Sequence, residues 1–288
     1  DKELGRQADR VEAIIPQVEI IKPQFEELFQ RKLFAESIKI SGSKAYIFRD
    51  RRLPRRQEVI PLPMDYLQSI PVEIRVKSCE LASSEVEYEE YPKSGYGQTG
   101  IFRLERVRAT ISPLINYPSK KDIDYLVMKV SASVMGSGSA TATMMMPVRK
   151  DEPYRIKGRF ENLDLPKLNS SSENLGKIRI KSGFLDFLSF DFTMTDQQST
   201  GQIVGAYHGL IIQQLKKHMK TKNVADFSSF MLRHIIIPLN KDESMPEKKR
   251  TGKVIYRRDP TRFVTYYYLH TLLRAVEASF TLGFLLPK

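Results

Sequence analysis

The densest group of chemically capable side chains is a cluster of arginines near residue 50. It comprises Arg49, Arg51, Arg52, Arg55 and Arg56. Guanidinium groups bind phosphate oxygens through two parallel hydrogen bonds, so such a cluster is suited to hold a phosphate group. Five arginines around Pro54 also describe a solvated loop, and the residues alone leave both interpretations open.

Residues able to support catalysis or metal binding are scattered along the chain. The single cysteine, Cys79, and the histidines show no spacing that would bring three ligands to one metal. Asp186 and Asp191 are five residues apart, so in an unbroken strand they project to opposite faces and make a poor acid/base pair. We therefore expect no catalytic residues, no metal and no cofactor. The histidines are His208, His218, His234 and His270.

A glycine-rich stretch at Gly136-Ser-Gly138 loosely imitates a dinucleotide-binding loop. It lacks the third glycine and stands between two alternating apolar stretches, where a helix would have to follow. We interpret it as a hairpin turn. The chain also has no Walker A sequence and no Gly-x-Ser-x-Gly elbow, so nucleotide hydrolysis and serine esterase chemistry lose their usual support.

The net charge is strongly positive, with 46 Lys and Arg against 34 Asp and Glu, which gives +12 at pH 7. A basic surface favours partners rich in phosphate, such as nucleic acid or anionic lipid. Binders of single-stranded nucleic acid interleave aromatic and basic side chains on one surface. Here the aromatic residues alternate away from the Lys and Arg, so we expect anionic lipid rather than nucleic acid.

The elements that carry these residues are mostly strands, because apolar residues recur at every second position. Clear examples are residues 126–134, 140–146 and 154–160, and further strands are expected at 38–48, 72–76, 101–111, 178–194, 202–213 and 253–257. Helices are few: short ones are expected at 23–33 and 227–235. A longer one begins at Asp259-Pro260 and closes the fold.

Three similar phrases suggest how the strands are arranged. These phrases are Ile38-Lys-Ile-Ser-Gly42, Ile74-Arg-Val-Lys-Ser78 and Ile178-Arg-Ile-Lys-Ser-Gly183. A glycine or small polar residue between two half-strands fits a bulge or bend, so the sheet should coil progressively. We predict a mainly β fold: a curved antiparallel sheet in the form of a half-pipe, with few short helices and a C-terminal helix. Residues 1–35 would lead into the sheet, and residues 36–288 would form the groove domain.

One face of such a sheet is apolar and must be covered. A second sheet would give a sandwich, closure would give a barrel, and partial coverage would leave a trough for lipid acyl chains. Around residues 184–192 both faces are apolar, which fits either a trough on one side or a strand buried on both faces. We predict from parity that the trough is lined by Met128, Val130, Met144, Met146, Phe187, Leu188 and Phe190.

The succession of phrases resembles the AsmA-like envelope proteins of Gram-negative bacteria, in particular the AsmA-related periplasmic domain common in Bacteroidota. The similar stretches cover roughly residues 36–280. They include Ser37-Ile-Lys-Ile-Ser-Gly42, Ile70-Pro-Val-Glu-Ile-Arg-Val76, Leu163-Asp-Leu165, Ile178-Arg-Ile-Lys-Ser-Gly183, Phe190-Asp-Phe-Thr193, Tyr207-His208 and Gly252-Lys-Val-Ile-Tyr256. The resemblance implies a periplasmic protein held to the membrane by an N-terminal anchor, with a repeating β-groove proposed to carry phospholipid. It supplies no catalytic residues.

The leading hypothesis is therefore a non-enzymatic lipid-handling module that contributes to phospholipid transport or outer-membrane homeostasis. Acyl chains would lie on the apolar face, and the anionic headgroup would lie near the arginine cluster. The alternative is a structural or interaction domain with a closed β core, whose sheet edge binds an envelope partner. No apolar run is long enough to span a bilayer, and the chain begins at Asp1. We expect either a removed anchor or leader, or an excised fragment.

Overall fold

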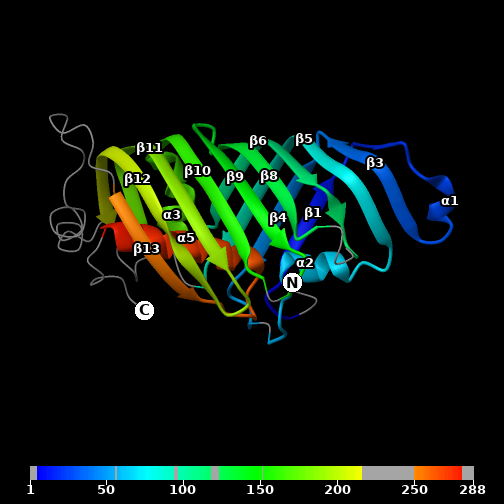
Figure 1. Ribbon diagram of the computed structural model, residues 1–288. Helices are drawn as coiled ribbons and strands as arrows, with labels where there is room; N and C mark the ends of the chain where they lie inside the picture. The colour runs from blue at the N-terminus through cyan, green and yellow to red at the C-terminus, as the bar shows by residue number, and fades with distance from the viewer. Residues whose placement is uncertain are drawn as a thin grey trace.

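The protein folds as one large open sheet with helices on one side (Figure 1). The computed structural model describes residues 5–55, 57–93, 97–117, 123–150, 152–215 and 250–280. Thirteen strands form the sheet: β1 (Asp9–Ile14), β2 (Gln17–Ile21), β3 (Lys32–Ser41), β4 (Lys44–Asp50), β5 (Glu73–Tyr91), β6 (Gly100–Ser112), β7 (Leu114–Ile115), β8 (Tyr125–Val134), β9 (Gly138–Pro147), β10 (Tyr154–Asp164), β11 (Ile178–Met194), β12 (Gln198–Gln214) and β13 (Arg250–Arg257). The predicted mainly β fold is confirmed.

The helical elements are short except for the last. They are α1 (Phe25–Leu28), α2 (Pro63–Gln68), a 3-10 turn at Leu165–Leu168, α3 (Asn169–Gly176) and α5 (Val264–Phe280). The predicted C-terminal helix is thus present. The helix expected at 227–235 lies outside the described residues.

The sheet is mixed, which corrects the antiparallel prediction. Strands β3 and β4 both pair with β5 in parallel, whereas β5, β6 and β8–β13 pair antiparallel in sequence order. Parallel pairing requires a crossover between the two strands. Residues 51–72, which include α2, supply it by returning the chain from the end of β4 to the start of β5.

Two of the repeated phrases end in bends of the kind expected. Gly42 joins β3 to β4 with a φ of 67°, and Gly183 has a φ of 143° where the pairing of β11 with β12 shifts register. Both values lie in a region that side chains other than glycine rarely adopt. A further shift lies in β5 between Leu81 and Ser84. Such irregularities increase local twist and curve the strand, so the sheet coils.

The curvature brings distant strands to the same helix. Ser170 and Ser171 of α3 donate hydrogen bonds to the Ile101 carbonyl of β6 at 2.7 and 2.8 Å. Asn169, beside them, donates to the Ile180 carbonyl of β11 at 2.8 Å. Three strands, β8, β9 and β10, separate β6 from β11 in the sheet. One helix can bridge them only because the sheet curls around it.

Both α3 and α5 lie on the same face of the sheet. A Cβ placed on Gly100 of β6 would meet Leu175 of α3 at 2.5 Å, and one placed on Gly252 of β13 would meet the Ala275 carbonyl of α5 at 2.1 Å. The cross-strand pairings put Gly100 and Gly252 on one face. We call this the helix face, and the other the open face. In Figure 1 the open face is toward the viewer, with α5 crossing behind β11, β12 and β13.

The largest buried cluster forms where α5 and α2 pack on the helix face. Tyr267 of α5 is 1% exposed, and its hydroxyl donates to the Thr195 carbonyl at 3.1 Å. Thr271 and Ser199 share a buried hydrogen bond of 2.7 Å. At α2, the Met64 amide donates to the Tyr154 hydroxyl. Other members of the cluster are Leu62, Leu126, Met146, Ile156, Phe192, Met194, Ile203, Val254 and Ala275.

Replacing Gly252 by alanine should separate α5 from β13. The added methyl would meet the Ala275 carbonyl and the Ser279 amide, both backbone atoms of α5 that cannot move independently. Overpacking of this kind costs about 1–3 kcal/mol, so the urea midpoint should fall. Gly176→Ala is the control for loss of a glycine, since its φ is not positive and its Cβ would meet nothing within 4 Å. Equal effects of the two changes would show that α5 does not pack this closely.

Candidate functional site

Two apolar rows cross almost the whole sheet on the helix face. Neighbours in each row are directly paired residues on adjacent strands. The first row is Val18, Ile40, Leu81, Ala109, Val130, Ala142, Gly158, Phe190 and Ile203. The second is Ile20, Ile38, Cys79, Ile111, Met128, Met144, Ile156, Phe192 and Gly201, followed by Val254. Directly paired residues point to the same side, so each row is a continuous apolar surface.

The two ends of each row differ in exposure, although Ile38, next to the edge in the second row, is only 9% exposed. Beneath α5, Ile203 is 1% exposed and Phe192 is 4% exposed. At the edge strand β2, Val18 is 53% exposed and Ile20 is 42% exposed. The apolar face thus emerges from under α5 and continues to an edge where it meets solvent.

Between these limits lies a group that we call the central apolar strip. It consists of four paired neighbours on β5, β6, β8 and β9, namely Leu81, Ala109, Val130 and Ala142. Each is half-buried, and none belongs to or packs against a buried cluster. A contiguous apolar surface left partly exposed is a candidate binding face.

The residues predicted to line a trough fall into three groups. Val130 lies in the central apolar strip. Met146 is buried in the main cluster, and Met128, Met144, Leu188 and Phe190 are partly buried against it. The hydroxyl of Tyr268 on α5 lies 3.9 Å from the Met144 sulfur, so the protein's own helix covers this part of the face. Phe187 lies on the open face.

Phe187 lies on the face opposite to Leu188 and Phe190 because successive residues of a strand point to opposite sides, and the pairing of β11 is regular from Phe187 to Met194. It pairs with Glu161 on β10, and the guanidinium of Arg159 lies 4.2 Å from its ring centroid. A cation over an aromatic face is favourable and shields the ring from water. The apolar character of both faces near 184–192 therefore reflects this stacked contact on the open face.

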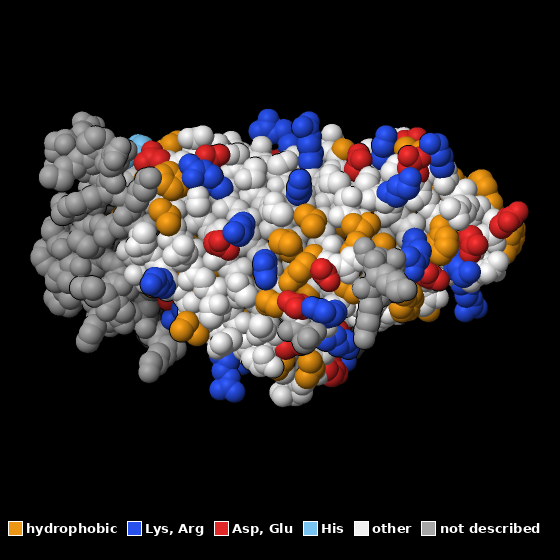
Figure 2. Space-filling view, viewed as in Figure 1, with side chains coloured by type: hydrophobic (Ala, Val, Ile, Leu, Met, Phe, Trp, Pro, Cys, Tyr) orange, Lys and Arg blue, Asp and Glu red, His pale blue; other side chains and the backbone are white. Residues whose placement is uncertain are grey.

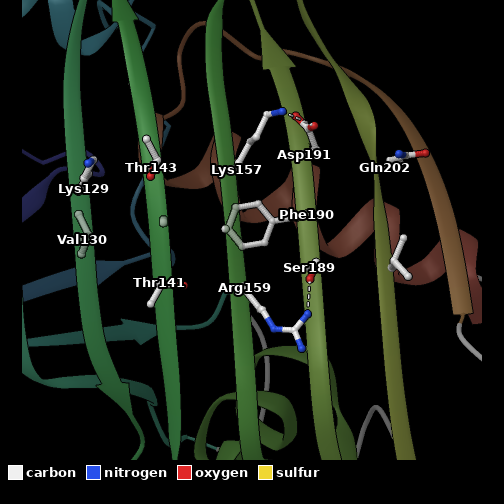
Figure 3. A pocket seen from close by; sticks show the side chains of 13 residues that line it. Lys129, Val130, Thr141, Thr143, Lys157, Arg159, Ser189, Phe190, Asp191 and Gln202 are labelled. Atoms are coloured by element: carbon white, nitrogen blue, oxygen red, sulfur yellow. Dashed lines mark hydrogen bonds and ion pairs between the residues drawn. The ribbon is translucent and has the colours of Figure 1, made fainter.

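The open face carries a shallow trough of about 650 Å³ across β8–β12 (Figure 3). Its lining includes Val130, Ala142, Phe190 and Val204 as well as charged and polar residues. Its charged groups are largely paired: Lys157 contacts Asp191 at 3.0 Å, and Arg159 contacts Glu161 at 2.6 Å and Ser189 at 2.9 Å. Asp191 is the one carboxylate among the lining residues. Figure 2 shows scattered charges of both signs over this face. The arrangement offers neither a carboxylate pair for glycan cleavage nor a concentrated charge for nucleic acid.

Most of the arginine cluster near residue 50 is held by carboxylates. Arg49 is 3% exposed and donates to both carboxylate oxygens of Asp9 at 2.6 and 2.8 Å. Arg51 contacts Glu90 at 2.9 Å, and Arg52 contacts Asp50 at 2.6 Å. These pairs anchor β1 and the chain following β4. Arg55 is exposed, and Arg56 lies outside the described residues.

Further positive charge lies beside this cluster, at the start of α5. Arg258 and Arg262 are each 7% exposed. The centre of the His270 ring lies 3.8 Å from the centre of the Tyr266 ring. Burial, together with the positive charges of Arg51, Arg274 and Arg262, lowers the pKa of His270 to about 4. The imidazole is therefore neutral in the folded protein at pH 7.

Stability should fall as the pH drops from about 6.5 to about 4, because His270 protonates in the unfolded chain before it protonates in the folded one. The unfolded state then binds more protons, and we expect this histidine to cost about 2 kcal/mol by pH 4. Urea unfolding at pH 7 and pH 4.5 would measure it. His270→Gln should flatten the dependence, and the exposed His208→Gln should not; equal slopes in all three proteins would contradict the assignment.

Other kinds of site are not found in the described part of the chain. No group of three or more His, Cys, Asp or Glu side chains there is placed to hold a metal ion. No helix among these residues is long and apolar enough to cross a membrane. Comparisons of the chain with family models, curated proteins and solved structures find no match. The site must therefore be judged on its geometry.

The alternation of apolar residues within single strands did not predict several residues of this site. Leu81 and Ala109 stand in stretches interrupted by serine or arginine, where no clean alternation is visible. Arg262 lies 206 residues beyond the end of the arginine cluster at Arg56. Only the register of the strands and the return of α5 across the sheet bring these residues together with the ones predicted.

Proposed function

We propose that the protein is a non-enzymatic lipid-handling module that binds acyl chains along the helix face. The observation that carries this proposal is the central apolar strip, which continues through the half-buried Ile40 to the exposed Val18. A water-soluble ligand would gain nothing from such a surface. An acyl chain gains about 0.8 kcal/mol for each CH2 removed from water.

The shape of the rows suits an extended, flexible ligand. Small side chains at Ala109 and Ala142 leave space beside Leu81 and Val130, and no polar side chain interrupts the first row. Binding along the first row would depend on the apolar area removed from water rather than on hydrogen bonds, so many different acyl chains would fit. The resemblance to AsmA-like envelope proteins supports a periplasmic location and phospholipid as the ligand, as parts of the same proposal.

Native mass spectrometry of the gently purified protein, followed by lipid extraction, tests this proposal. We expect adducts of phospholipid mass that are displaced by excess oleate. A protein that stays free of lipid after purification and after incubation with phosphatidylglycerol vesicles would refute lipid binding.

A second candidate is a structural or interaction domain with no lipid ligand. The contact of Tyr268 with Met144 favours it, because α5 covers much of the face that an acyl chain would otherwise use. The open edge at β1 and β2 then becomes the functional surface, since unpaired backbone groups there can accept a strand from an envelope partner. Lipid-free protein that assembles through this edge would support this candidate.

A further inference from the structure

A small cavity of about 10 Å³ lies where the chain after β4 meets the start of α5. Three guanidinium groups line it, those of Arg49, Arg55 and Arg262, together with Gln7, Thr261 and Phe263. A volume of this size admits roughly one water molecule, or one oxygen atom of a larger group. The cavity is therefore suited to part of an oxyanion whose remainder stays in solvent.

The three arginines are not equally available. Arg49 is committed to Asp9, as its two hydrogen bonds show. Arg262 is 7% exposed, and its Nε is buried without a hydrogen-bond partner. The nearest carboxylate, that of Asp259, lies 3.5 Å from this Nε, too far for a good hydrogen bond. A buried unpaired N–H costs stability unless a ligand or water satisfies it.

The Asp259 carboxylate lies beside Arg55 and Arg262 and forms a loose ion pair with Arg262, so an incoming phosphate has to compete with it. The Asp259 carboxylate accepts hydrogen bonds from the Thr261 amide and hydroxyl at 3.0 and 2.7 Å. The exposed Arg55 has no carboxylate within 4 Å among the described residues. The α5 helix begins at Val264, so the positive end of its dipole adds to the two guanidinium groups.

The cavity adjoins one end of the apolar face. Arg49 points to the helix face two residues after Ile47, whose cross-strand neighbours are Val11 and Tyr88. Val11 is 60% exposed at the edge strand β1. A ligand with its chains beside Val11 and Ile47 would have its charged end next to the cavity, whereas the central apolar strip lies nine residues away along β5, at Leu81 rather than at Glu90.

We propose that Arg55 and Arg262 form a phosphate-binding pocket at the N-terminus of α5, so that the protein prefers lipids that carry a phosphate group. The preference for lipid rests on the proposed function, whereas the phosphate pocket does not. Dioleoylphosphatidate and dioleoylglycerol share their acyl chains and differ in the phosphate. Their binding, measured by native mass spectrometry from the same detergent micelles, isolates the contribution of the pocket.

The wild-type protein should bind phosphatidate roughly tenfold more tightly than dioleoylglycerol, as expected for charge-assisted hydrogen bonds. Arg55→Gln should remove this preference and leave dioleoylglycerol binding unchanged. Arg108→Gln, an equal loss of charge at an exposed position on the open face, should retain it. The proposed pocket would be refuted if Arg55→Gln still preferred phosphatidate to dioleoylglycerol. It would also be refuted if Arg108→Gln removed this preference as strongly as Arg55→Gln.

Two further arms separate this proposal from lipid binding in general. Inorganic phosphate, followed by ³¹P NMR line broadening, should bind the wild type and not the Arg55→Gln variant. This result would support the pocket even if neither lipid binds. Equal binding of both lipids by the wild type would overturn the pocket and leave the acyl-chain site standing. Arg262→Lys keeps the charge but removes the Nε donor, and it should weaken phosphate binding in protein that circular dichroism shows to be folded.

Discussion

Replacing Ala142 by aspartate should reduce lipid binding roughly tenfold or more while the protein stays folded. Ala142 is half-buried in the central apolar strip, between Val130 on β8 and Gly158 on β10. A carboxylate there would have to lose its water wherever an acyl chain lay across it, which costs several kcal/mol. Lipid occupancy after purification, read by native mass spectrometry, measures the effect.

The chain offers a matched control one residue away. Thr141 is exposed on the open face, so Thr141→Asp adds the same charge to the same strand on the other side. It should leave lipid occupancy unchanged. Ala142→Phe tests the same position by filling space without charge, and it should also displace lipid. Equal losses in Ala142→Asp and Thr141→Asp would mean that the helix face is not the binding surface.

Replacing Arg49 by methionine should lower the free energy of unfolding by about 3–5 kcal/mol. The change leaves the Asp9 carboxylate, whose side chain is 11% exposed, without its guanidinium partner. It removes a cation 3.9 Å from Glu90, which keeps its contact with Arg51. It also removes the guanidinium from the Phe263 ring, 4.6 Å away, and so loosens α5 from β4. Urea denaturation at pH 7 measures the loss.

Lys44, on the same strand, is the control for this prediction. Its side chain is 65% exposed and pairs with Glu85, which is 55% exposed, and exposed pairs contribute at most about 1 kcal/mol. Lys44→Gln should therefore have a small effect. If Arg49→Met were as mild as Lys44→Gln, Arg49 would not be a structural residue, and its guanidinium would be free for a ligand.

The sequence predicts the parts of this fold that depend on local pattern. Alternation along 126–134 and 140–146 identifies β8 and β9, because the side chains of a strand alternate between its faces. Glycine at 42 and 183 locates bends, since few other residues adopt these φ values. The pair Asp259-Pro260 predicts the C-terminal helix, which begins at Val264.

Features that depend on contacts distant in sequence could not be predicted. The parallel pairing of β3 and β4 with β5 depends on the path of residues 51–72, which has no periodic pattern. The sheet also includes residues 9–21 as edge strands, and β3 spans the boundary predicted at residue 35.

In the candidate site, too, local pattern predicts some features, whereas others depend on contacts distant in sequence. Parity placed Met128, Met144 and Leu188 on the apolar face, yet it could not reveal that α5 packs beside them. Phe187 does not share this face with Leu188 and Phe190, because successive residues of a strand point to opposite sides. For the arginines, composition shows the cluster but not the carboxylates that neutralise Arg49, Arg51 and Arg52.

The most direct test of the account is to find where an acyl chain lies. A phospholipid with a photoactivatable group in its acyl chain, cross-linked to the protein and mapped by peptide mass spectrometry, gives that position. The account predicts labels at Leu81, Val130 and Ala142, and their loss in Ala142→Phe. Labels confined to open-face residues such as Lys129, Thr141 and Lys157, or no label at all, would contradict it.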